Sequence, residues 1–113
     1  MIAATLNSIT ECAHLYPQVK KDELHKGDWV VIHTVKSVYT LHVLGDCLYE
    51  AKGGWFDKKG CTPMKIGVAG ATWGGSAIMP QVLAACGMRV EFRNRLITSE
   101  VKSILVIPYR IAN

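Results

Sequence analysis

The segment from Trp29 to Leu44 constrains the fold most, because Val, Ile, Thr, Tyr and Trp dominate it and Lys36-Ser37 is its only polar break. These residue types favour strands, since their side chains pack well on a pleated surface. We therefore expect a hairpin with strands at 28–35 and 38–45 that closes on Lys36-Ser37. Neither turn residue is Gly or Asn, so a wider loop stays open as an alternative.

The two faces of this hairpin differ, because residues two positions apart in a strand share a face. The first face is core-like and holds Val30, Ile32, Thr34, Tyr39, Leu41 and Val43. The second is amphipathic and holds Trp29, Val31, His33, Thr40 and His42. A turn at Lys36-Ser37 would place His33 opposite Thr40 and diagonal to His42. Such a face is typical of a groove or partner surface, so Trp29, His33 and His42 are candidate binding residues. Surface or hydrogen-bonded strand histidines are the alternative.

Further strand patterns follow the hairpin. We expect strands near Cys47 to Glu50, at Met64 to Thr72, at Met88 to Phe92, and from Leu96 to Ile107 with a kink at Ser99-Glu100. The stretch from Ser76 to Cys86 contains Pro80 and stays open between a short helix and strand or loop. At the other end of the chain, apolar residues recur at helical spacing before Pro17, which predicts a short helix over residues 3–15.

Strands joined by short turns indicate a mainly β fold, a small antiparallel β-barrel or β-sandwich with a short N-terminal α-helix. The 113 residues suit a single domain spanning 1–113. Hydrophobic residues make up 50% of the chain and charged residues 19%, against about 25% charged in an average soluble domain. This balance favours burial of an apolar face by a partner, so we expect a homo-oligomer.

The net charge is +4, from 13 Lys and Arg against 9 Asp and Glu, but the basic residues are scattered. Trp55-Phe56 stands just before Lys58-Lys59, and aromatic side chains beside basic ones are typical of single-strand nucleic-acid binding. Trp55 and Phe56 are therefore candidate binding residues. The alternative, which we favour, is that these aromatics fold back onto the core.

A glycine-rich run from Met64 to Gly75 resembles the opening of an NAD(P)-binding domain. The spacing of Gly67, Gly70 and Gly74 does not match that motif, and only 18 residues follow Arg95, too few to complete a parallel sheet. We expect a strand, a loop and another strand, and whether the Gly67–Gly75 loop binds a phosphate stays open. The 23 uncharged residues from Ile66 to Met88 contain too much Gly and Pro to favour a membrane span.

The four cysteines, Cys12, Cys47, Cys61 and Cys86, form no CxxC pair, and the N-terminus lacks the pattern of a secretory signal. We therefore expect free thiols in a reducing, cytoplasmic compartment. The sequence names no third ligand to join His33 and His42 at a metal, no nucleophile motif and no cofactor, so an enzyme is the third choice of function.

Two segments, Gly27–Tyr39 and Ile97–Ile104, look similar to short uncharacterised bacterial proteins. In those, a G-D/R-x-V strand leads into T-x-x-S-x-Y, and a T-S-x-V-x-S-I strand closes the fold. The resemblance implies a compact β fold without a known activity and assigns no functional residue. We expect a non-catalytic binding or assembly module that self-associates, with a nucleic-acid-binding small β-barrel as the alternative.

Overall fold

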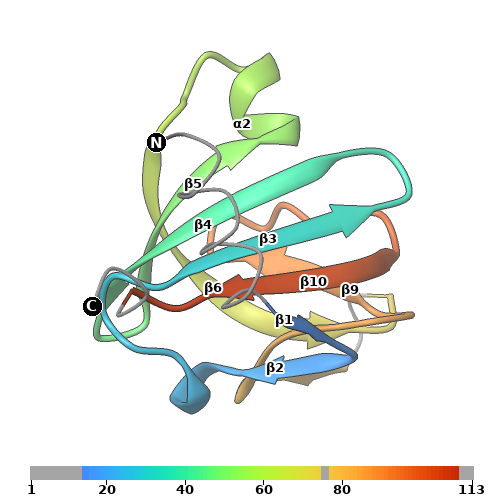
Figure 1. Ribbon diagram of the computed structural model, residues 1–113. Helices are drawn as coiled ribbons and strands as arrows, with labels where there is room; N and C mark the ends of the chain where they lie inside the picture. Colours follow the sequence, from blue (N-terminus) through green and yellow to red (C-terminus); the bar gives the residue numbers. More distant parts are fainter. Residues whose placement is uncertain (1–13, 75–76, 110–113) are drawn as a thin grey trace, which may run out of the picture.

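The computed structural model describes residues 14–74 and 77–109 and is built mainly from antiparallel strands (Figure 1). In chain order the elements are β1 (His14–Tyr16), β2 (Gln18–Lys20), the 3-10 helix η1 (Lys21–Glu23), β3 (Trp29–Thr34), β4 (Val38–Gly45), β5 (Leu48–Gly53), α2 (Gly54–Lys58), β6 (Met64–Thr72), β7 (Ile78–Met79), β8 (Val82–Ala85), β9 (Arg89–Phe92) and β10 (Val101–Ile107).

The strands form a curled, half-barrel sheet. Its order is β1-β10-β3-β4-β5-β6-β7, with β9 also paired to β6, while β2 and β8 form a separate two-stranded ribbon. Strand β10 thus returns from the end of the chain to lie between β1 and β3 (Figure 1). Residues just before β10 bind β9 as well, since Thr98 N–H donates to the Val90 carbonyl at 3.0 Å. The segment 98–107 therefore contacts β9 at one point and β3 at another.

The β3–β4 hairpin is confirmed, with strands close to the predicted ranges. Its register differs from the prediction because the turn residues are Val35-Lys36. Thr34 N–H donates to the Ser37 carbonyl at 2.8 Å, and Ser37 N–H donates to the Thr34 hydroxyl at 3.0 Å. The side-chain bond of Thr34 closes the turn one residue earlier than expected. The pairing therefore shifts by two residues, which keeps each side chain on its predicted face.

The inner face of the hairpin forms part of the core. All six residues predicted there are buried: Val30, Ile32, Thr34, Tyr39, Leu41 and Val43. Next to them an aromatic cluster joins three elements. Phe56 from α2 makes edge-to-face contacts with Tyr39 and Phe92, at ring-centroid distances of 6.0 and 5.1 Å. Such pairs contribute beyond their buried area, so this cluster anchors α2 to the sheet.

Two uncertain segments of the sequence are clarified. Within the open stretch from Ser76 to Cys86, the described residues 77–86 form β7 and β8 rather than a helix, with Pro80 between the two strands. The glycine-rich run is largely strand, because β6 continues through Gly67 and Gly70 to Thr72. Gly70 is needed there: its φ is +151°, and a Cβ atom would overlap the Met79 carbonyl. A phosphate-binding loop from strand to helix is therefore not formed at Gly67 and Gly70.

The predicted helix over residues 3–15 falls largely outside the described residues. Its last two positions, His14 and Leu15, belong to β1 instead, where they pair with β10. At these two positions, pairing with β10 satisfies the backbone and outweighs the predicted helix. No helix within residues 14–74 and 77–109 is long and apolar enough to cross a membrane.

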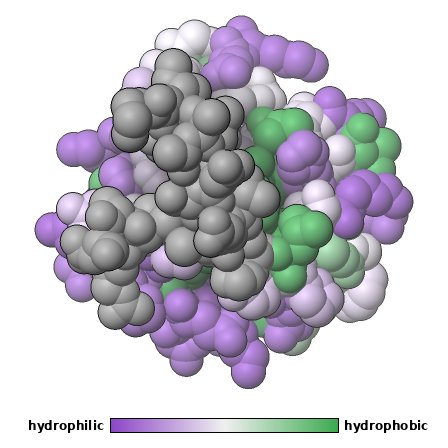
Figure 2. All heavy atoms as spheres, in the orientation of Figure 1, coloured by the Kyte–Doolittle hydropathy of each residue, from purple (hydrophilic) through white to green (hydrophobic). Residues whose placement is uncertain are grey.

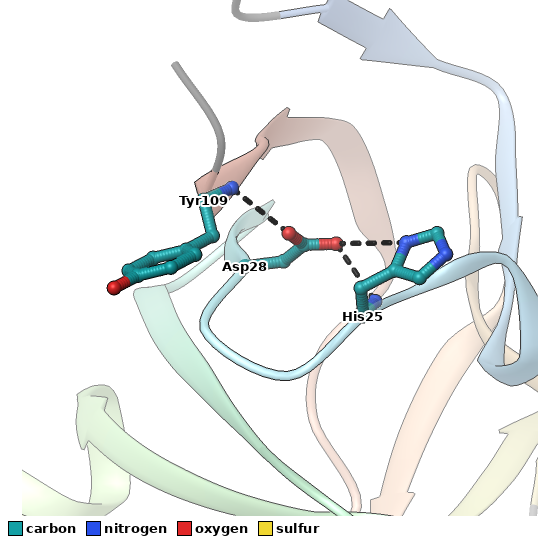
Figure 3. A network of polar contacts seen from close by, with 3 residues as sticks. All are labelled: His25, Asp28 and Tyr109. Atoms are coloured by element: carbon teal, nitrogen blue, oxygen red, sulfur yellow. Dashed lines mark hydrogen bonds and ion pairs between the residues drawn. The ribbon is translucent and has the colours of Figure 1, made fainter. Parts of the chain in front are cut away.

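Asp28 ties the start of the hairpin to Tyr109, which follows β10 (Figure 3). Its buried carboxylate accepts the backbone N–H of His25 at 2.8 Å and that of Tyr109 at 2.9 Å. The His25 imidazole Nδ1 lies 3.8 Å from the same carboxylate. Gly27 allows this arrangement, because a Cβ atom there would stand 2.7 Å from the Tyr109 ring.

Candidate binding cleft

A cleft of about 440 Å³ opens where the β3–β4 turn, α2, β9 and the segment before β10 meet. Its volume falls in the range of small-ligand sites, about 300–1,000 Å³. Its lining residues come from four parts of the chain: Val35, Lys36, Ser37, Tyr39, Trp55, Lys58, Arg89, Leu96, Ile97, Thr98, Ser99 and Glu100. We call this the end cleft.

The position of α2 at the end cleft depends on Gly53 and Gly54. Their φ angles are +91° and +44°, in the region that side chains disfavour. A Cβ atom on Gly53 would overlap the Val38 carbonyl, and one on Gly54 would overlap the Tyr39 ring. The two glycines therefore let the chain leave β5 and start α2 directly beside β4.

Asp57 fastens the same segment from its exposed side. Its carboxylate accepts the backbone N–H of Gly53 at 3.0 Å and the hydroxyl of Thr62. The bond from Thr62, helped by that from Gly53, holds the pKa of Asp57 below its ordinary value. Hydrogen bonds to the ionised form favour that form, so this connection is strongest when Asp57 is charged.

Trp55 and Phe56 are neighbours in the chain but lie in different environments. Phe56 is fully buried, as the favoured alternative of aromatics folding back onto the core expects, so its ring does not face the cleft. The single turn of α2 points successive side chains in different directions. Trp55 is half-buried, lines the end cleft and packs edge to face on Phe56 at 5.4 Å. Its backbone N–H donates to the Tyr39 hydroxyl at 3.4 Å. The indole is thus part of the cleft wall.

The end cleft carries an excess of positive charge. Lys36, Lys58 and Arg89 line it, and within the described part of the chain none of them forms an ion pair. The single lining carboxylate, Glu100, lies 3.6 Å from the Lys102 ammonium group. Three cations against one carboxylate leave the lining with a net positive charge, which attracts anions.

The wall opposite α2 is held by bonds between two turns. Lys36 N–H donates to the Ser99 hydroxyl at 3.0 Å, and Val35 N–H donates to the Glu100 carbonyl at 3.0 Å. These bonds fix the backbone that carries Lys36 against the segment before β10. The side chains of Lys36, Lys58 and Arg89 are exposed, and they are free to adapt to a ligand.

The predicted binding face of the hairpin, with Trp29, His33 and His42, is called the outer sheet face from here on. The structure brings two of these three residues together. Trp29 stands directly opposite His42, and their rings stack with centroids 4.2 Å apart and planes 9° apart. His33 stands opposite Val38, so the predicted diagonal pairing of His33 with His42 is wrong, for the reason of register given above. A second hollow, of about 290 Å³, lies beside His42 and Tyr109, with Lys26 as its only charged lining residue.

Other titratable groups away from the end cleft have structural roles. The Lys21 ammonium group donates to the Val68 carbonyl at 2.5 Å, next to the register shift between β6 and β9. Burial lowers the pKa of Lys21, and burial raises the pKa of Tyr49 to about 12. The described part of the chain has no group of three or more His, Cys, Asp or Glu that could hold a metal ion.

The cysteines that the structure describes, Cys47, Cys61 and Cys86, are free thiols, and Cys12 lies outside the described residues. Comparisons of the chain with models of protein families, with curated proteins and with solved structures give no match. The resemblance to small bacterial proteins therefore stays a prediction.

Sequence reasoning missed Lys36 and Arg89 as functional candidates. They are 53 positions apart, and neither stands beside an aromatic residue in the chain. Only the adjacency of Trp55 to Lys58 carried a signal, because both belong to α2. The meeting of these groups depends on the long-range pairings of β6 with β9 and of β3 with β10.

Proposed function

We propose that this protein is a non-catalytic binding module whose end cleft holds an anionic ligand. The observation that carries the proposal is the convergence of Lys36, Lys58 and Arg89 on one cleft beside a half-buried indole. Cations without partners attract an anion over a long range, and an aromatic wall adds contact area once the ligand is bound.

The wider setting of the proposal is a small β-barrel or β-sandwich that presents this cleft at one end, in the cytoplasm. Support for a reducing compartment comes from Cys47, Cys61 and Cys86, which are free and at least partly exposed. Three cations and an indole in one lining are the groups that hold an anionic ligand, so binding is the chemistry that we propose for the cleft.

The experiment is a titration with inorganic polyphosphate, which offers negative charge without any ring. We expect wild type to bind it, and binding to weaken as salt rises. The variant Lys36→Gln with Lys58→Gln should bind clearly more weakly. The matched control, Lys20→Gln with Lys65→Gln, removes the same charge from exposed positions outside the cleft. An equal loss of affinity in both variants would mean that net charge alone causes binding, and it would reject the end cleft as the binding site.

A second candidate function is self-association through the outer sheet face. Across four paired strands, Leu15, Leu105, Val31 and Thr40 lie side by side on that face. Leu15 is 72% exposed and Val38 43% exposed, and Figure 2 shows apolar side chains at the surface next to the grey atoms. A largely apolar row on the outer side of a sheet favours contact with another protein surface.

Light scattering at micromolar concentration tests this second function. We expect a mass above that of one chain for wild type and a lower mass for Leu15→Lys, because a charge in the row opposes burial. The control is Ile97→Lys, which places the same charge on an exposed apolar residue of the end cleft. A single-chain mass for wild type throughout would contradict self-association.

A further inference from the structure

We infer that the ligand of the end cleft is single-stranded nucleic acid, with one base against Trp55 and its phosphates on Lys36, Lys58 and Arg89. The inference rests on the proposed function, since it names the ligand class of the same cleft. The observation behind this inference is that an aromatic wall and three cations line the same cleft. A simple anion would contact only the cations, and an uncharged ring would contact only the aromatic wall.

The aromatic part of the cleft suits a flat ring. Trp55 is neither buried like Phe56 nor free in solvent, and its packing on Phe56 holds the indole in place. Each base of a nucleic acid has a π-face, so stacking on such a side chain tolerates any sequence. Tyr39 stands behind Trp55 and makes the wall continuous with the core.

The charged part of the cleft suits a backbone of phosphates. The three cations come from the β3–β4 turn, from α2 and from β9, so they surround the cleft from different sides. Each phosphate contact releases a counterion, and for single strands log K falls with log salt at a slope of about −0.7 per contact. Three contacts predict a slope of about −2.

The surroundings of the cleft favour a strand over a free nucleotide. Positive charge continues beyond the lining, because Lys59 follows Lys58 at the end of α2 and both side chains are exposed. A chain that leaves the cleft along α2 would pass these groups. A mononucleotide would reach only the cleft itself and would use fewer of them.

The probe is a fluorescein-labelled oligothymidylate of about ten nucleotides, within the usual site size of a small single-strand binder. Fluorescence anisotropy measures its affinity between about 50 and 200 mM salt. Trp55→Leu should weaken binding by about 5- to 150-fold, which is the usual contribution of one stacked base, without changing the salt slope. Trp55→Phe keeps a ring and should retain most of the affinity.

The charge variants measure the other half of the contact. Lys36→Gln with Lys58→Gln should reduce the slope from about −2 to about −0.7, because one of three contacts remains. The control, Lys20→Gln with Lys65→Gln, should keep the wild-type slope. Thermal melting of every variant establishes that it is folded before its affinity is compared.

Titrations with inorganic polyphosphate and with thymidine monophosphate distinguish a failure of the nucleic-acid inference from a failure of the proposed anion site. If polyphosphate binds as tightly as the oligonucleotide and Trp55→Leu has no effect, the nucleic-acid inference fails while the anion cleft stands. If monophosphate binds as tightly as the oligonucleotide, the ligand is a free nucleotide and the strand is rejected. If neither polymer binds, the inference and the proposed function fail together.

Discussion

Trp29 and Trp55 are both half-buried, and their surroundings are built in opposite ways. On the outer sheet face, Trp29 stacks on His42, its partner across one hairpin. In the end cleft, Trp55 lies with Lys58 of the same helix and with Lys36 and Arg89 from distant parts of the chain. The first arrangement satisfies the indole within the protein, whereas the second leaves part of it and three positive charges for something else. An exposed tryptophan therefore indicates a binding site only when its surroundings leave complementary groups unused.

The two tryptophans also differ in what lies beneath them. Trp29 alternates along β3 with buried Val30, so the sheet itself positions it. Trp55 depends on one short helix that is anchored by Phe56 and by the glycines at its start. The cleft should consequently respond to changes in α2 that leave the outer face intact.

The largest expected effect comes from Phe56→Ala. Loss of a fully buried aromatic side chain leaves a cavity and should lower the free energy of unfolding by about 3–5 kcal/mol, measured by urea denaturation. Trp55→Leu should cost clearly less, because its side chain is only half-buried. Equal costs for the two variants would make Trp55 a core residue and remove the contrast between the two neighbours.

The next effect separates two glycines that both have positive φ angles. Gly60→Ala should cost about 1–2 kcal/mol, because its φ of +68° disfavours a side chain although the space is open. Gly53→Ala should cost more, since its Cβ atom would also meet the Val38 carbonyl, and it should weaken polyphosphate binding as α2 shifts. If Gly60→Ala is as damaging to stability and binding as Gly53→Ala, close packing at the start of α2 does not position the cleft.

How far the sequence predicts this molecule depends on the range of the interaction. Side-chain alternation is local, so the core face of the hairpin is predicted correctly even though the register is not. The register depends on which residues form the turn, and the bond between Thr34 and Ser37 decides it. A shift of two residues preserves every face but moves His33 away from His42.

The candidate site shows more strongly that contacts between distant residues cannot be predicted from local sequence patterns. Trp55 and Lys58 could be identified together because one helical turn joins them. Lys36 and Arg89 join them only through pairings between strands that are distant in sequence, and scattered basic residues give no sign of such a meeting. Charge that looks incidental along a chain can therefore be concentrated by a β fold.

A smaller effect tests the outer face. A double-mutant cycle of Trp29→Ala and His42→Ala, measured by urea denaturation, should give a coupling of about 0.5–1.5 kcal/mol, typical of a stacked aromatic pair. Neither single variant should alter polyphosphate binding. A coupling near zero would mean that the stack does not satisfy Trp29, which would restore the outer face as a candidate binding surface.

The smallest effect is a pH dependence at α2. The folded pKa of Asp57 lies below its ordinary value of 3.8, so its contribution to stability is present above that value and is lost as pH falls through the lowered folded pKa. The unfolding free energy of wild type should therefore approach that of Asp57→Asn in strong acid. The difference should be small, because an exposed carboxylate is screened by water. A difference that stays constant from neutral to strongly acidic pH would contradict the bonds from Thr62 and Gly53.

The central claim is that ligand binding occurs at the end cleft and not at the outer sheet face. Amide chemical shifts in ¹H–¹⁵N spectra, followed while oligothymidylate is added, test it directly. The account predicts that the shifts concentrate at 35–37, 55–58 and 96–100 and leave Trp29, Val31 and His42 unchanged. Shifts that concentrate at Trp29, Val31 and His42, or no shifts at all at saturating oligonucleotide, would contradict it.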